Sequence, residues 1–186
     1  MRRFLLLPAA VALLPAGCTT VQVPPLEPLG KERAVLEPVR YIPQQESEDC
    51  AAACLTTVLR YHGSDLTLDD VDAGLKRVRD GGVIPAEIIY FARKQGYRVT
   101  LYGGGLNDLR RKVLAGKPLV LLVHDSPRPT RLLARRPGHY LVAVGFDDRD
   151  AEAVVHTGDR AFGRLSYATL HVRWKRSGFL TLLVER

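Results

Sequence analysis

The stretch YIPQQESEDCAAACLTTVLRYHG, from Tyr41 to Gly63, decides how the rest of the chain is interpreted. A polar, acidic segment leads directly into Cys50, and the small and aliphatic residues that follow favour an α-helix that Gly63 would end. Cys50 is therefore expected at or near the N-terminus of a helix. The helix dipole and the free backbone N–H groups at such a position stabilise a thiolate, which is the nucleophilic form of cysteine.

Two other polar residues are candidates to work with this cysteine. Gln44 lies six residues before Cys50 and carries a neutral amide that a folded loop could direct at an oxyanion. His139 follows Pro137-Gly138 and opens an apolar run typical of a strand, so its ring is expected at the end of a sheet as a general base. His124 is the reserve candidate for that base. A free cysteine is otherwise most often a core residue, and Cys54 is interpreted as one.

Together these segments resemble cysteine peptidase family thirty-nine, the bacteriocin-processing, papain-like group. The resemblance rests on Gln44, Asp49-Cys50 with its Ala-rich helix, and the strand HYLVAVGFD from His139 to Asp147, and it extends over residues 38 to 185. It implies an α+β, papain-like cysteine peptidase fold in which an N-terminal helical half packs on a C-terminal antiparallel sheet. It also implies cleavage of a peptide bond in a peptide or protein substrate, with no metal and no organic cofactor.

The resemblance assigns Cys50 as nucleophile, His139 as base and Gln44 as oxyanion donor, but it leaves the third triad member open. Relatives end the return strand in Asp-Pro, whereas this strand ends in Val-His-Thr-Gly-Asp. We assign the orienting role to His156. Thr157, Asp159 from the following loop, and a Cys–His dyad are the alternatives. A catalytically impaired binding protein and an amidase or transferase acting on peptidoglycan stem peptides also fit this pattern.

The N-terminus predicts export. Met1-Arg2-Arg3 precedes eleven largely apolar residues, FLLLPAAVALL, which are too few to span a bilayer and typical of a secretory signal. The sequence LPAGC that follows resembles a bacterial lipobox, so Cys18 is expected to be lipidated. The prediction is therefore a signal peptide over 1–17, a lipidated cysteine with a Pro-rich tether over 18–38, and a peptidase domain over 39–186. Thr19 favours sorting to the outer membrane, with the domain facing the periplasm.

Composition is compatible with that location. The 186 residues are 46% hydrophobic, which suits one globular domain, and the formal net charge is +7. In an exported, membrane-anchored protein this charge indicates an anionic envelope surface rather than nucleic acid, and the envelope partner is left open. The loop 125–138, rich in Arg and Pro, is either a basic wall for an anionic substrate or a solvated surface loop.

The periodicity of apolar residues and the positions of Gly, Pro and capping residues predict the remaining elements. Helices are expected over 50–62, 67–75, 85–95, 107–115 and 166–174, and strands over 97–102, 118–124, 139–146, 153–155 and 179–185.

Overall fold

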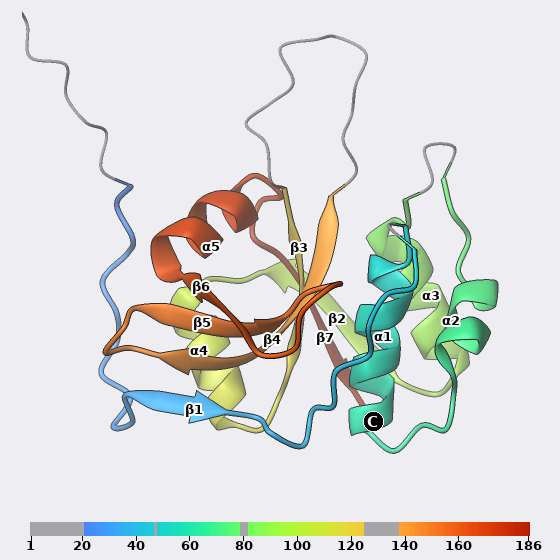
Figure 1. Ribbon diagram of the computed structural model, residues 1–186, viewed down its shortest axis with the longest axis horizontal. Helices are drawn as coiled ribbons and strands as arrows, with labels where there is room; N and C mark the ends of the chain where they lie inside the picture. Colours follow the sequence, from blue (N-terminus) through green and yellow to red (C-terminus); the bar gives the residue numbers. More distant parts are fainter. Residues whose placement is uncertain (1–20, 47, 79–81, 125–137) are drawn as a thin grey trace, which may run out of the picture.

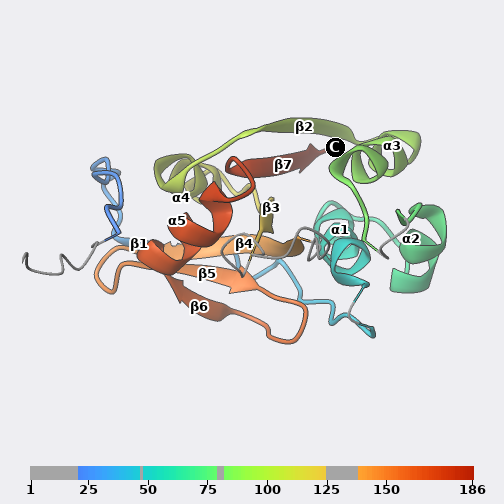
Figure 2. The same cartoon turned by 90° about the horizontal axis from the view of Figure 1, so that it is seen from above.

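The computed structural model describes residues 21–46, 48–78, 82–124 and 138–186. Within these ranges a seven-stranded antiparallel sheet has the order β2-β7-β3-β4-β5-β6, and β1 pairs with part of β4. In Figure 2, β2 and β7 lie along one side of the molecule and β5 and β6 along the other, with β3 and β4 between them. The helices are α1 (Cys50–Tyr61), α2 (Leu68–Gly74), α3 (Pro85–Lys94), α4 (Leu106–Leu114) and α5 (Tyr167–Lys175). The strands are β1 (Arg33–Val35), β2 (Arg98–Gly103), β3 (Leu119–Val123), β4 (His139–Asp147), β5 (Glu152–His156), β6 (Gly163–Ser166) and β7 (Leu180–Glu185).

The sheet separates two apolar cores. One core joins α1, α2 and α3 to the face of β4 that carries Tyr140 and Val142. The other joins α4 and α5 to the opposite face, which carries Leu141 and Ala143. Figure 1 accordingly shows α1 to α3 grouped at the right and α4 and α5 at the left. This arrangement follows from alternation along β4, because successive side chains of a strand point to opposite faces of its sheet.

Helix α1 is the most buried helix, since every residue from Cys50 to Leu59 is buried. Three consecutive alanines after Cys50 let the first turn pack closely against β4. The next helix begins as its sequence predicts, with a capping box in which Thr67 accepts from the backbone of Asp70 and Asp70 accepts from the backbone of Thr67. Likewise, α5 is capped by Ser166, whose hydroxyl accepts from the backbone N–H of Thr169.

The predicted α+β fold class and the ten predicted elements are confirmed, with end points shifted by one residue at most. Two short strands, β1 and β6, were not predicted. Three residues of β1 and four of β6 carry too little alternation to stand out, and both form by pairing with strands already present. None of the helices in the described ranges is long and apolar enough to cross a membrane.

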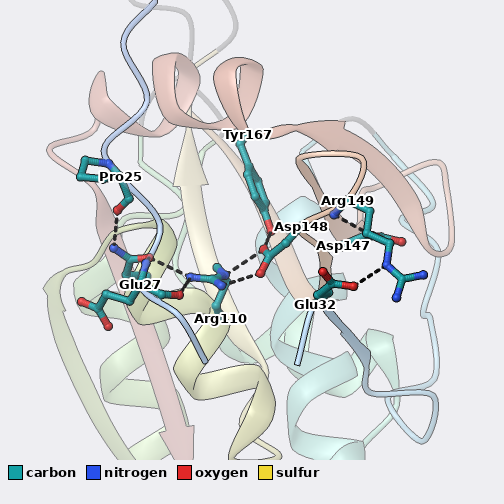
Figure 3. Close-up of polar contacts among 9 residues, drawn as sticks. Pro25, Glu27, Glu32, Arg110, Asp147, Asp148, Arg149 and Tyr167 are labelled. Atoms are coloured by element: carbon teal, nitrogen blue, oxygen red, sulfur yellow. Dashed lines mark hydrogen bonds and ion pairs between the residues drawn. The ribbon is translucent and has the colours of Figure 1, made fainter. Parts of the chain in front are cut away.

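The segment predicted to be a tether is docked on the domain instead (Figure 3). Asn107 at the start of α4 accepts a hydrogen bond from the backbone N–H of Glu27 and donates one to the carbonyl of Pro25. Further along, the carbonyl of Glu32 accepts from the N–H of Asp148, and β1 then pairs with β4. Residues 25–38, which were expected to be part of an extended tether, therefore lie against the domain, and residues 18–20 lie outside the described ranges.

A buried arginine holds this docked segment in place. Arg110 of α4 is 2% exposed and donates to both carboxylate oxygens of Asp148, to the carbonyl of Glu27 and to the side chain of Asn107. The hydroxyl of Tyr167 donates to the same carboxylate at 2.6 Å. Burial, followed by this bond, raises the pKa of Tyr167. One guanidinium thus joins α4, the N-terminal segment and the β4–β5 turn, and the shared carboxylate adds α5.

Replacing Arg110 by Met should lower the free energy of unfolding by about 2 to 4 kcal/mol, because the partly buried Asp148 then loses its cation. Urea denaturation followed by circular dichroism measures this loss. The control is Arg111→Met, one residue later, whose ion pair with Glu27 joins side chains that are 48% and 50% exposed. That change should cost less than about 1 kcal/mol. Equal losses in the two variants would show that the buried network is not what stabilises this end of the molecule.

Candidate active site

The site begins at the first residue of α1. Cys50 is 8% exposed and opens the helix directly after Asp49. Asp49 does not cap the helix with its side chain. One of its carboxylate oxygens accepts from the backbone N–H of Glu46, and the other accepts from Arg77 at 2.7 Å. The side chain of Asp49 therefore shapes the loop that leads to Cys50. It does not cap the backbone N–H groups of the first turn of α1.

The thiol of Cys50 lies against strand β4. Burial raises the pKa of this thiol, and the charge of Asp49 raises it further. Hydrogen bonding from the backbone N–H groups of Tyr140 and Ala51 lowers it, and so does the guanidinium of Arg77. Since burial is the largest of these effects, the helix N-terminus alone does not make Cys50 a thiolate. The bond with Tyr140 also brings the sulfur to the peptide group that joins His139 to Tyr140.

Arg77 and Tyr140 fix the distance between the start of α1 and β4. Arg77 follows α2, and its guanidinium donates to the carbonyl of Glu48 at 2.8 Å and to the carboxylates of Asp49 and Asp72. Its backbone forms an isolated bridge with Val83, and the buried hydroxyl of Tyr140 donates to the carbonyl of Val83 at 3.0 Å. The loop around Cys50 and the strand beside it are thus tied to the same short segment before α3.

His139 is the first residue of β4, as predicted, and is half-buried. It lines a hollow of about 330 Å³ together with Thr157 and Asp159, the residues that follow β5. Thr157 donates to the carboxylate of Asp159 at 2.7 Å. This hydrogen bond is the main cause of the lowered pKa of Asp159, and the charges of Arg160 and His139 lower it further. Asp159 is therefore an ionised group close enough to His139 to interact with it electrostatically.

His156 does not occupy the place that the sequence analysis gave it. In the β4–β5 register it pairs with Val142, three residues further along β4 than His139. The side chain is 2% exposed and both ring nitrogens contact the backbone: Nε2 the carbonyl of Val39 at 2.8 Å, and Nδ1 the N–H of Phe162 at 3.1 Å. Burial lowers the pKa of this imidazole. The assignment of His156 as the residue that orients His139 is corrected, because both of its ring nitrogens are already engaged elsewhere.

Gln44 packs directly on Gly158, the residue after Thr157. Its backbone N–H donates to the carbonyl of Gly158 at 3.1 Å, and the hydroxyl of Tyr41 donates to the same carbonyl at 2.7 Å. A Cβ atom on Gly158 would lie 1.8 Å from the side-chain oxygen of Gln44. That oxygen is buried and has no hydrogen-bond partner among the described residues. The side chain of Gln44 thus fills the space that any residue larger than glycine would need at position 158.

The predicted residues take part in three separate contacts. Cys50 meets the His139–Tyr140 peptide, Asp159 interacts with His139, and Gln44 lies on Gly158 between Thr157 and Asp159 in sequence. Gly158 and Arg77 were not singled out from the sequence. Gly158 could have been noticed, because a glycine at the end of a strand often marks the close approach of another segment. The position of Arg77 in the sequence gave no indication that it contacts Asp49. The loop 125–137 lies outside the described residues. No group of three or more His, Cys, Asp or Glu that could hold a metal ion occurs within the described ranges.

Cys54 lies one turn further along α1 and is 5% exposed. Burial raises its pKa well above the ordinary value, and both Cys50 and Cys54 are free thiols. The interpretation of Cys54 as a core residue is confirmed.

Comparison with known families identifies the domain that contains these residues. A model of the Peptidase C39 family matches residues 38–181, which include Gln44, Cys50, His139 and Asp159. The chain belongs to the peptidase C39 family. The match ends within β7 and begins after β1, so the docked N-terminal segment lies outside it. No curated protein matches the sequence.

Solved structures show where this C39 domain belongs among folds. A putative C39-like peptidase from Bacillus anthracis has a TM-score of 0.70 at 16% identity, covering 84% of this chain and 98% of its own. The peptidase domain of ComA from Streptococcus has a TM-score of 0.60 at 17% identity, covering 78% of this chain and 97% of its own. Xylellain, a cysteine protease from Xylella fastidiosa, has a TM-score of 0.54 at 12% identity, covering 83% of this chain and 86% of its own. At these identities the likeness establishes the papain-like fold.

Iodoacetamide should alkylate Cys50 in the folded protein and leave Cys54 unmodified, as read by mass spectrometry of the peptides. In His139→Ala, alkylation at pH 7 should slow by about tenfold or more, because the buried thiol then ionises without a base beside it. Its rate should keep rising with pH beyond the range in which an ordinary cysteine thiol titrates, since burial raises the pKa of Cys50.

Asp159→Asn should slow the same reaction less than His139→Ala does, because it removes the interacting charge and not the base. The matched control is His171→Gln, a histidine of α5 outside the site, which should leave the rate unchanged. Faster labelling of Cys54 than of Cys50, or an unaltered rate in His139→Ala, would contradict this assignment.

Proposed function

We propose that the protein is a lipid-anchored cysteine peptidase of the bacterial cell envelope, which cleaves a peptide bond by acyl transfer through Cys50 and His139. The observation that carries the proposal is the packing of Cys50 in one core with Tyr140, the residue directly after His139. Membership of the peptidase C39 family supports the same chemistry. Gln44 and Asp159 supply the two further groups that such a reaction uses.

The reaction starts with transfer of the thiol proton from Cys50 to His139. The thiolate then attacks the carbonyl carbon of the scissile peptide, and the oxyanion that forms accepts hydrogen bonds from the Gln44 side-chain amide and the backbone N–H of Cys50. When the tetrahedral intermediate collapses, the C–N bond breaks and His139 gives its proton to the leaving amine. His139 next takes a proton from water, which attacks the thioester, releases the acid product and restores the thiol of Cys50.

Asp159 is the positioning residue in this proposal. An ionised carboxylate near an imidazole favours the imidazolium that forms when Cys50 loses its proton. Thr157 holds the carboxylate through its hydroxyl, so this pair replaces the Asp-Pro that relatives carry at the end of the return strand. Because Asp159 is exposed, its stabilisation of the imidazolium is weaker than that of a buried carboxylate.

A non-catalytic protein that uses the same cleft for binding is the second candidate. The observation that favours it is the raised pKa of Cys50, which keeps the thiol neutral unless His139 accepts its proton. The alkylation rates of wild type and His139→Ala separate the two candidates, since a protein without a thiolate–imidazolium pair would give equal rates at neutral pH.

Gly158→Ala should lower peptide hydrolysis by about 10²- to 10³-fold, the loss that follows removal of one oxyanion donor. The added methyl group displaces the side chain of Gln44. Alkylation of Cys50 by iodoacetamide should change little, because no oxyanion forms in that reaction. The free energy of unfolding should stay within about 1 kcal/mol of wild type, since only the end of a flexible side chain must move.

The control for this variant is Gly103→Ala in β2, where an added Cβ makes an ordinary contact of 3.5 Å with a backbone oxygen. It should retain both hydrolysis and alkylation. Parallel losses of hydrolysis and alkylation in Gly158→Ala would indicate damage to Cys50 or His139 and would count against the role of Gln44.

The lipid anchor is proposed at Cys18, on the strength of the basic and apolar leader and the sequence LPAGC. In a Gram-negative host the wild-type protein should partition with membranes, and Cys18→Ala should be released with the soluble periplasmic fraction. Cys50→Ala is the control and should partition like wild type. Membrane association of Cys18→Ala equal to that of wild type would exclude lipidation at this residue as the anchor.

A further inference from the structure

The segment that leads into Cys50 is acidic, with carboxylates from Glu46, Glu48 and Asp49. The side chain of Asp49 is 13% exposed, so solvent screens its charge only in part. Burial raises the pKa of the Cys50 thiol, and the charge of Asp49 raises it further. A carboxylate directly before the proposed nucleophile therefore opposes the ionisation that the proposed reaction needs.

Arg77 supplies the opposite charge at the same place. Its guanidinium donates to one carboxylate oxygen of Asp49 at 2.7 Å and to the backbone carbonyl of Glu48 at 2.8 Å. The Arg77 side chain is 29% exposed, so this ion pair is less screened than one on the open surface. Against burial, which raises the pKa of Cys50, the charge of Arg77 lowers it.

Contacts from the opposite side also fix the position of Arg77. Its guanidinium donates to the carboxylate of Asp72 in α2, and its backbone pairs with Val83 in an isolated bridge. The carbonyl of Val83 in turn accepts from the hydroxyl of Tyr140 on β4. Arg77 thus lies where α2, the loop before α1 and a contact from β4 meet. A planar guanidinium with five N–H donors suits several acceptors at once.

Among the described residues, Cys54, Tyr140 and His139 are the other titratable groups on the elements next to the thiol. Cys54, one turn along α1, has a pKa well above its ordinary value because it is buried. Burial, followed by the charges of the two cysteines, also raises the pKa of Tyr140 on β4. His139, which precedes Tyr140, is the proposed base. Asp49 and Arg77 are therefore opposite charges that can be altered without changing the residues proposed to react.

We infer that Arg77 is a positioning residue for the proposed reaction, which holds the loop before Cys50 and offsets the charge of Asp49 beside the thiolate. Without Arg77 the attacking sulfur would carry its negative charge next to an unpaired carboxylate, and close like charges disfavour ionisation. This inference rests on the proposed peptidase function and adds to it a residue that favours the ionised form of Cys50. Because Arg77 favours the thiolate and Asp49 disfavours it, removing each charge should change the reactivity of Cys50 in opposite directions.

The test measures the rate of iodoacetamide alkylation at Cys50 across pH, a readout that requires no peptidase activity. Arg77→Gln should slow alkylation at pH 7 by about three- to tenfold, because the thiolate loses a nearby cation. The rise of its rate should move to higher pH, and at high pH, where the thiol is ionised in both proteins, the two rates should converge. Asp49→Asn should accelerate alkylation at pH 7 by about the same factor, since it removes the opposing charge.

The double variant Arg77→Gln, Asp49→Asn separates an electrostatic role from a structural one. Its alkylation rate at pH 7 should return to within about twofold of wild type, because both opposing charges beside the thiol are then absent. A purely structural role of Arg77 predicts the reverse, since loss of a second contact would leave the double variant at least as slow as Arg77→Gln. That result, or a wild-type rate in Arg77→Gln, would overturn the inference.

Two neighbouring residues provide matched controls. Lys76→Gln removes an exposed cation one residue before Arg77 and should leave the pH profile of alkylation unchanged. Asp72→Asn removes the carboxylate of α2 that Arg77 contacts and should change the rate less than Asp49→Asn does. In peptide hydrolysis, Arg77→Gln should lower kcat/KM at pH 7 by the same factor as the alkylation rate. If wild type cleaves no peptide, the alkylation rates still decide the role of Arg77, and the peptidase proposal alone fails.

Discussion

The site depends on one contact, between Cys50 and Tyr140, which pack in the same core. It joins the first turn of α1 to the first residues of β4, and so brings a residue of the N-terminal helical part to a histidine that follows it by 89 positions. Hydrogen bonds maintain this contact from both sides. Arg77 donates to the carbonyl of Glu48 in the loop before α1, and the Tyr140 hydroxyl donates to the carbonyl of Val83. The same closeness that places the thiol buries it, and burial raises the pKa of Cys50.

Much of this could be predicted from the sequence, because its signals are local. Helix α1 follows from an Ala-rich run ending at Gly63, and β4 from the apolar residues after His139. The choice between His156 and Asp159 as the orienting residue could not be made from the sequence, since it depends on register. Val142 pairs with His156, so the return strand passes His139 with the residues beyond His156. The two candidates for the orienting role, the buried His156 and the exposed Asp159, are three residues apart. Strand ends inferred from sequence are uncertain by that much.

His156 shows how a polar residue can be misread when its partners are distant in sequence. Its ring nitrogens join residues from the N-terminal segment and from the loop after β5, at Val39 and Phe162. A histidine that bonds two backbone groups inside the core has a structural role that no motif reveals. The same reason explains why the contacts of the N-terminal segment with α4 were not predicted. Its prolines indicated an extended chain, correctly, but the surface of α4 on which it lies is formed by residues about 80 positions away.

The docked N-terminal segment also sets how far the domain would stand from a bilayer. The segment is hydrogen-bonded to α4 from Pro25 onward, seven residues after Cys18. An extended chain spans at most about 3.6 Å per residue, so this connection would be at most about 25 Å long. A domain held by a lipid at Cys18 would therefore stay within about 25 Å of the membrane surface. Its substrates would be those that diffuse within this thin layer, such as neighbouring lipoproteins and the exposed ends of membrane proteins, and its search would run in two dimensions.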